Sequence, residues 1–93
     1  MTGHDVLISK TTARQLDKLE RLIAKRIRRK LQVLEEDPVR SRPGADIRLL
    51  WGTTSPRSYR LRVGDTMILY FVVGKEVRVT EVLHRSQAYR GLD

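Results

Sequence analysis

The stretch YRLRVGDTMILYF, residues 59–71, decides the fold of this 93-residue chain. Its first half alternates between apolar side chains and arginines, as does a strand with one buried face and one open face. A turn at Gly64-Asp65 follows, and from Met67 onward the residues are almost wholly apolar. We therefore predict two strands joined as a hairpin, of which the second is central in its sheet because both of its faces are apolar.

Arg60 and Arg62 in this stretch are candidate functional residues. The period of a strand places both on one face, about 6 to 7 Å apart. That spacing matches successive phosphates of a polyanion, or one phosphate held from two sides. A solvated strand face explains the pair equally well, so the alternation alone does not decide between the two interpretations.

The chain downstream continues as a meander of three strands. They are predicted at about 58–63, 66–73 and 77–83. A loop of three residues after the middle strand would place Met67 and Arg85 on the same face of the sheet. A loop of two residues would instead place His84 on the face of Met67. The sequence does not choose between the two loops.

The chain upstream predicts a strand followed by helix. Val6–Ile8 is a short apolar run, and Thr11 or Thr12 is expected to cap the helix that follows. Residues 13–36 contain no Gly or Pro and carry one apolar stripe, so they predict one long helix or a helical hairpin. The charge pattern near 19–20 suggests a break at that point.

Together these elements predict an α+β fold with an N-terminal strand, a long helix or helical hairpin, and an antiparallel three-strand meander. The sheet would have about four strands, with helices on one face and the other face open. Residues 38–57 hold all three prolines and are expected to form a connection, in which 47–51 could dock on the core. The length and the lack of repeats predict one domain, residues 1–93.

The composition is strongly basic, with 19 Lys and Arg against 11 Asp and Glu and a formal charge of +8. Such a surface favours nucleic acid, an anionic membrane or an acidic protein as partner. No apolar run approaches the roughly 18 to 20 residues that span a bilayer, and no exposed apolar helix face is expected, so a membrane is not a predicted partner. The chain has no cysteine, which excludes disulfides and thiolate metal sites and suits a cytoplasmic protein.

Two further clusters contain candidate functional residues. The run after the last strand includes His84, Arg85 and Tyr89, which offer a proton carrier near neutral pH, a guanidinium and a phenol. The helical region carries a basic face that is expected to attract RNA or DNA without selecting sequence. The residues of that face are Lys18, Arg21, Lys25, Arg28 and Arg29. Taken singly, each residue is also explained by a surface or core-edge role.

Metal and cofactor sites are not predicted. The chain has no glycine loop of the kind that cradles phosphates, and no cluster of Asp, Glu and His suggests a metal. Any catalysis would therefore be metal-free and built from Arg, His and Tyr. RNA cleavage allows this, because the ribose 2′-hydroxyl is an internal nucleophile that needs positioning, proton transfer and stabilisation of the phosphorane charge.

The sequence resembles the RelE/ParE toxin superfamily of bacterial and archaeal toxin–antitoxin pairs over most of its length. The motifs that carry the resemblance are LEEDP (34–38), YRLRVGDTMILYFV (59–72) and VRVTEVLHRSQAYRG (77–91). The resemblance implies a small basic α+β toxin that a co-expressed acidic antitoxin wraps and blocks. It also implies that operator DNA is bound only through the antitoxin complex.

For RelE-type members, the resemblance implies an endonuclease that cleaves mRNA on the ribosome, without metal or another cofactor, and so inhibits translation. Arg60 and Arg62 match the basic pair before the glycine turn and would orient the substrate and stabilise its phosphate. Arg85 would offset charge on the phosphorane. Tyr89 would stack on a base or move a proton, and His84 would be a general acid or base.

Met67 departs from the family pattern, which usually has an arginine at this position. Loss of an arginine aimed at the transition-state phosphate costs orders of magnitude in rate. Arg85 could replace it, or the chain could be a weak or degenerate, non-toxic relative. The remaining alternative is a ParE-type protein, which inhibits DNA gyrase and has no nuclease activity.

Overall fold

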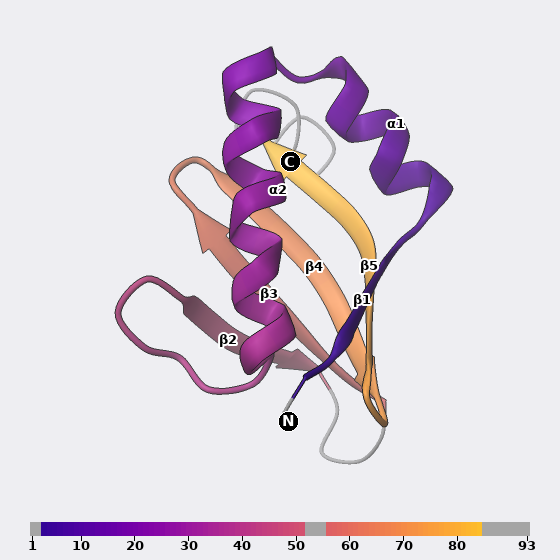
Figure 1. Ribbon diagram of the computed structural model, residues 1–93, viewed down its shortest axis with the longest axis vertical. Helices are drawn as coiled ribbons and strands as arrows, with labels where there is room; N and C mark the ends of the chain where they lie inside the picture. Colours follow the sequence, from indigo (N-terminus) through magenta and orange to yellow (C-terminus); the bar gives the residue numbers. More distant parts are fainter. Residues whose placement is uncertain (1–2, 52–55, 85–93) are drawn as a thin grey trace.

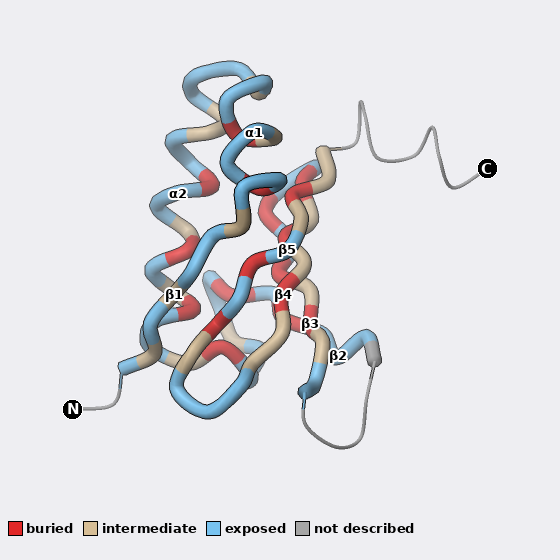
Figure 2. The backbone as a smooth tube through the Cα atoms, turned by 90° about the vertical axis from the view of Figure 1, so that its right-hand side faces the viewer, coloured by how far each residue is buried: buried red, intermediate tan, exposed pale blue. Residues whose placement is uncertain are grey.

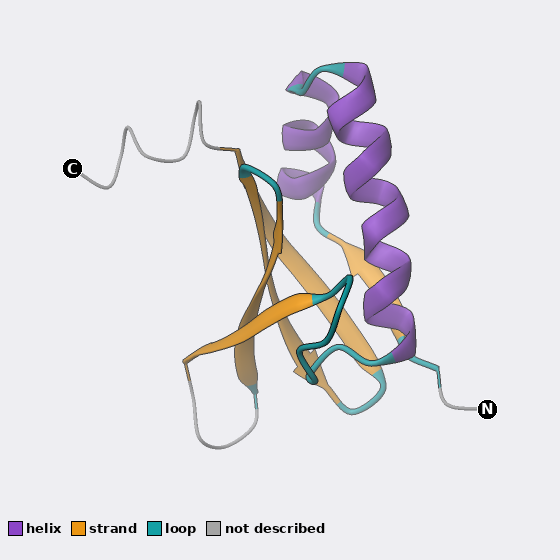
Figure 3. Cartoon of the chain, turned by 90° about the vertical axis from the view of Figure 1, so that its left-hand side faces the viewer, coloured by secondary structure: helices purple, strands orange, loops and turns teal. Residues whose placement is uncertain are grey.

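The computed structural model describes residues 3–51 and 56–84. The elements follow one another as β1 (Asp5–Ile8), α1 (Lys10–Lys18), α2 (Arg21–Glu36), β2 (Asp46–Trp51), β3 (Arg57–Val63), β4 (Thr66–Val73) and β5 (Glu76–His84). The strands form one sheet in the order β1-β5-β4-β3-β2, in which β1 is parallel to β5 and the other neighbours are antiparallel (Figure 1). Both helices lie on the same side of this sheet (Figure 3). The predicted α+β class and the central position of β4 are confirmed.

The strand β2 is the element that the sequence pattern missed. Asp46–Trp51 was expected to belong to a connection, but it pairs antiparallel with β3, so the described sheet has five strands rather than about four. Ile47 is buried, whereas Leu49 and Leu50 are each 48% exposed. Polar and apolar residues alternate only over residues 46–49, and this short run lies between Gly44 and Gly52 in the region that holds all three prolines, so it was assigned to a connection.

The helical region consists of two helices, separated at 19–20 where the charge pattern suggested a break. The cap of α1 was predicted wrongly, because Ser9 rather than Thr11 or Thr12 is the N-cap. The Ser9 hydroxyl accepts a hydrogen bond from the Thr12 backbone N–H at 3.0 Å. Thr12 itself is buried and donates its hydroxyl to the Val79 carbonyl at 3.2 Å, which ties α1 to β5. Neither helix among the described residues is long and apolar enough to cross a membrane.

The core lies between the two helices and the sheet. In Figure 2 the buried positions of the strands alternate with half-buried and exposed ones. The buried apolar residues of the helices are Leu16, Ile27, Leu31 and Leu34, and those of β3 to β5 are Tyr59, Leu61, Val63, Ile68, Tyr70, Val77, Val79 and Val82. Since both helices cover this face, the side chains at the alternate strand positions form an opposite face without helices.

A β-bulge in β5 changes which side chains face the core near the end of the described chain. The turn Gly74-Lys75 between β4 and β5 has two residues, and Gly74 has a positive φ of 59°. The register then shifts by one residue between Leu69 and Tyr70 of β4, so Thr80 is the extra residue on β5. The shift brings Val82, rather than its neighbours in the chain, into the core.

The bulge also determines what lies beside Met67. Leu83 is the partner of Met67 across the two strands, and His84 is paired with Thr66 instead. The prediction that a two-residue loop would place His84 on the face of Met67 is therefore wrong. A one-residue shift moves every later side chain of a strand to the other face of the sheet.

Candidate functional site

Arg60 and Arg62 lie on the face of the sheet opposite the helices, as the alternation predicted. Their neighbours in β3 are buried in the core, with exposures of 4% for Tyr59, 0% for Leu61 and 7% for Val63. Because successive side chains of a strand point to opposite faces, the two arginines share the open face.

Arg60 is held close to the surface of the sheet. Its side chain is only 11% exposed, and its Nη1 lies 3.7 Å from Oδ1 of Asp46 on β2. This Nη1 is buried and forms no hydrogen bond within the described part of the chain. Asp46 is 57% exposed, so the ion pair is weak. The weak pair therefore leaves Arg60 with a positive charge that no strong ion pair within the described residues offsets.

Arg62 is more exposed and lies opposite both Asp46 and Met67 across the neighbouring strands. Its Nε donates a hydrogen bond to the Gly64 carbonyl at 3.3 Å. This bond turns the guanidinium toward the β3–β4 turn and leaves its terminal nitrogens for a ligand.

An apolar strip lies beside the arginines on the open face. Register places on it the half-buried side chains of Met67, Leu69, Phe71 and Leu83. The open face therefore combines two arginines with an apolar strip that includes the aromatic ring of Phe71, and Met67 supplies no charge.

Of the predicted tail residues, the structure describes only His84, which it does not place on this face. Arg85 and Tyr89 lie outside the described residues. His84 ends β5 on the side of the helices and lines a small recess with Ile23 and Arg26 of α2. His84 is thus on the opposite side of the sheet from Arg60 and Arg62.

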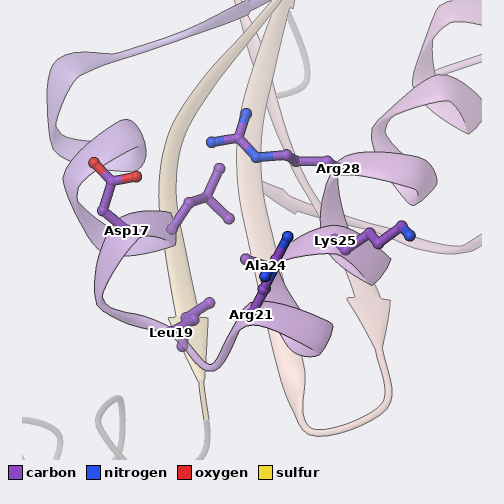
Figure 4. Close-up of a pocket in the computed structure, with 7 residues that line it drawn as sticks. Asp17, Leu19, Arg21, Ala24, Lys25 and Arg28 are labelled. Atoms are coloured by element: carbon purple, nitrogen blue, oxygen red, sulfur yellow. The ribbon is translucent and has the colours of Figure 1, made fainter.

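The basic helical residues form a second, separate region. Arg21, Lys25 and Arg28 line a pocket of about 470 Å³ between α1 and α2, which they share with Asp17. Figure 4 shows Arg28 extending from α2 toward α1 at this pocket. Lys18 lies in the last turn of α1, and Arg29 is exposed on α2. The helical layer and the core separate this region from the arginines of β3.

Sequence reasoning missed Arg26 and Lys30, which adjoin Arg62. All three line one recess at the end of the sheet. The signal was present in the helical period, because residues four apart share one side of a helix. Nothing in the sequence indicated that this side of the helix would meet β3.

The described residues contain no group of three or more His, Asp or Glu side chains that could hold a metal ion. Two of their carboxylates instead pair with arginines on the sheet: Asp46 with Arg60, and Glu76 with Arg78 at 2.8 Å.

Comparison with known proteins identifies the family. A family model described as the ParE toxin of the parDE type II toxin–antitoxin system matches residues 6–89. The chain belongs to the RelE/ParE toxin superfamily. It is accordingly the toxin component of a toxin–antitoxin system, and the resemblance found in the sequence motifs is confirmed. A search of curated proteins finds no match.

Solved structures from three organisms share the fold of this toxin. A chain of the archaeal RelE–RelB complex from Pyrococcus horikoshii OT3 is 30% identical, with a TM-score of 0.79 over 95% of this chain and 100% of that chain. A chain of the RelB–RelE antitoxin–toxin complex from Methanococcus jannaschii is 28% identical, with a TM-score of 0.69 over 94% and 99%. A chain of the RelBE2 complex from Mycobacterium tuberculosis, 22% identical with a TM-score of 0.73 over 89% and 99%, supports the fold alone.

Proposed function

We propose that this toxin is a metal-independent endonuclease that cleaves mRNA on the ribosome and so inhibits translation in the cytoplasm. The observation that carries the proposal is the pair Arg60 and Arg62 on a sheet face that the helices leave uncovered. The 30% identity to a chain of an archaeal RelE–RelB complex supports the RelE-type reaction.

The proposed reaction needs no metal ion or other cofactor, because the nucleophile is part of the RNA. The ribose 2′-oxygen attacks the adjacent phosphorus, the bond from phosphorus to the 5′-oxygen breaks, and the proton lost by the 2′-oxygen is balanced by one gained at the 5′-oxygen. Arg60 and Arg62 would orient the phosphate and offset charge on the phosphorane. Arg85 would add a further positive charge, and Tyr89 would stack on a base or move a proton. Because His84 lies on the side of the helices, we assign it no part in this step.

We also infer an acidic antitoxin as the partner of this toxin. The similar structures from Pyrococcus horikoshii and Methanococcus jannaschii are complexes of RelE with RelB, and a formal charge of +8 favours an acidic protein. Binding to operator DNA would occur through that complex. Inspection of the neighbouring reading frames for a small acidic protein, followed by co-purification of that protein with the toxin, tests this inference. A toxin that purifies alone at full yield without toxicity would contradict it.

Inhibition of DNA gyrase without nuclease activity is the second candidate function. The matching family model is described as a ParE toxin. Met67 lies opposite Arg62 on the open face, where the family pattern usually has an arginine. An active site with one positive charge fewer would stabilise a phosphorane less well.

Two assays on the purified toxin separate these functions. Translating ribosomes are mixed with toxin and the mRNA ends are mapped, and gyrase supercoiling is measured in parallel. We expect new mRNA ends with wild-type toxin, and a loss of about 10²-fold in cleavage rate for Arg62→Ala, as for removal of one transition-state donor. Arg14 is an exposed arginine on α1, and the Arg14→Ala variant should cleave mRNA at the rate of the wild type.

Intact mRNA together with inhibited supercoiling would overturn the endonuclease proposal in favour of gyrase inhibition. Intact mRNA, normal supercoiling and unimpaired growth on induction without antitoxin would identify a degenerate, non-toxic relative.

A further inference from the structure

A recess of about 290 Å³ opens where α2, the loop before β2 and the β3–β4 turn meet. Four cationic side chains and one carboxylate line it. They are Arg26, Lys30, Arg42, Arg62 and Asp46. The Asp46 carboxylate also lies 3.7 Å from Arg60, so its negative charge is shared between Arg60 and the cationic side chains of the recess. The recess therefore has a clear excess of positive charge, which raises the local concentration of anions.

Arg42 contributes charge to the recess, while its hydrogen bonds hold the surrounding backbone. Its Nη2 donates to the Val33 carbonyl at 3.1 Å, and its Nη1 donates to the Asp37 and Arg40 carbonyls at 3.0 and 2.6 Å. These bonds connect the end of α2 to the loop that leads into β2. Arg42 is thus a positioning residue for one wall.

The other three cations retain donors for a ligand. Lys30 donates from its ammonium to the Gly44 carbonyl at 2.7 Å, which leaves two of its three protons. Arg62 uses Nε for its one hydrogen bond to another described residue. Arg26 is exposed and has no hydrogen bond or ion pair with the described residues. Its Nη1 lies 3.9 Å from the position that a Cβ atom on residue 64 would occupy. Both Arg26 and Gly64 line the recess.

The recess is continuous with the open face of the sheet through Arg62. Arg62 is two positions after Arg60 in β3, so the two side chains share the open face. Arg62 also lines the recess with Arg26 and Lys30 of α2. Arg26 and Lys30 are four residues apart and so project from one side of α2. Lys25 and Arg29, each one residue earlier in the chain, are exposed on other sides of the same helix.

We propose that the recess binds a phosphate of the RNA backbone, and that the toxin holds the strand along a track from Arg60 and Arg62 to Arg26 and Lys30. The identity of the anion as RNA rests on the proposed function, whereas the site itself rests on the recess. A phosphate fits better than an acidic side chain of a protein, because Arg62 already belongs to the pair that faces the scissile phosphate and because guanidinium groups bind phosphate oxygens bidentately.

A binding experiment with matched variants tests the proposal. Arg26→Gln and Arg14→Gln, at an exposed arginine of α1, each lower the formal charge of +8 by one, so any difference between them reports position rather than net charge. The probe is a fluorescein-labelled, single-stranded 2′-O-methyl RNA, which cannot be cleaved, and its affinity is measured by anisotropy over a range of salt concentrations. Lys30→Gln and Lys10→Gln form a second matched pair, since Lys10 is exposed at the start of α1.

We expect Arg26→Gln and Lys30→Gln to weaken RNA binding severalfold more than their matched control variants do. Each should also reduce the slope of log affinity against log salt by about 0.7, the value for one phosphate contact on a single strand. Equal losses in affinity and slope within each pair would overturn the proposal, because the toxin would then attract RNA only through its overall charge. Thermal midpoints equal to that of the wild type confirm that Arg26→Gln folds.

Two further results separate this proposal from its alternatives. If Arg26→Gln and Lys30→Gln bind RNA as their partners do but lose the co-expressed antitoxin, the recess is a protein-docking surface and the proposal is wrong. If ribosomal mRNA stays intact while the Arg26 and Lys30 variants still lose RNA binding selectively, the proposed endonuclease function fails and the recess stands as a nucleic-acid site.

Discussion

At the scale of single residues, one buried phenol holds the loop that shapes the recess. The Tyr70 hydroxyl donates a hydrogen bond of 2.7 Å to the Pro38 carbonyl, and the rings of Tyr70 and Tyr59 stack with centroids 5.8 Å apart. Burial, and next the neighbouring Tyr59, raise the pKa of Tyr70 above its ordinary value of 10.0. The bond fixes the chain just after α2, from where it leads to Arg42 and β2.

Tyr70→Phe should lower the free energy of unfolding by about 1 to 3 kcal/mol near neutral pH, because the buried Pro38 carbonyl loses its donor. The raised pKa means that the stabilisation by Tyr70 is complete below the unfolded value of about 10 and is lost as the pH rises through the higher folded value. The difference between variant and wild type should therefore narrow above about pH 10. Urea denaturation of the variant and the wild type, near neutral pH and above about pH 10, measures this difference. A variant as stable as the wild type at neutral pH would contradict it.

At the scale of elements, the bulge at Thr80 decides which residues of β5 are buried. Val77 and Val79 follow the strand period, but the next buried residue is Val82, with an exposure of 2%. Strict alternation would have turned Glu81 toward the core. The bulge lets β5 keep its apolar side chains inside, and in doing so it places Leu83 beside Met67 on the open face.

Val82→Ala should lower the free energy of unfolding by about 2 kcal/mol, because two buried methyl groups are removed and a cavity remains. Glu81→Ala should change it by less than about 0.5 kcal/mol, as is usual for residues outside the core. The comparison is made by urea denaturation of both variants. If Glu81→Ala lowered the free energy of unfolding more than Val82→Ala does, the register after the bulge would be refuted.

At the scale of the whole molecule, positive charge gathers in two regions on different sides of α2. One is the pocket between α1 and α2, lined by Arg21, Lys25 and Arg28. The other is the track from the open sheet face to the recess, which includes Arg62 and Arg26. The formal charge of +8 on 93 residues also repels itself in the folded state.

The thermal midpoint of the isolated toxin should therefore rise between low and moderate NaCl, because salt screens this repulsion within a Debye length of about 10 Å at 0.1 M. A Lys25→Gln/Arg29→Gln variant, with its formal charge lowered by two, should show a smaller rise. Differential scanning fluorimetry over a salt series checks both. A midpoint that falls with salt in the wild type would mean that attractive ion pairs outweigh the repulsion.

The candidate site was only partly predictable from the sequence. Arg60 and Arg62 were found because a two-residue period assigns side chains to faces without knowledge of the rest of the fold. Arg26 and Lys30 were not found, because their meeting with Arg62 joins a helix and a strand distant in the chain. Arg85 and Tyr89 lie outside the described residues, so their roles stay predictions.

The sequence by itself determined the α+β class, the hairpin around Gly64, the central place of β4 and the face that the two arginines share. These follow from periodicity and turn chemistry, which act over a few neighbouring residues. Only the tertiary structure decided the fifth strand at Asp46–Trp51, the side of the sheet taken by His84 and the recess beside Arg62. Edge pairing, a one-residue bulge and helix–sheet contacts depend on hydrogen bonds and packing between distant segments, and local patterns do not encode them.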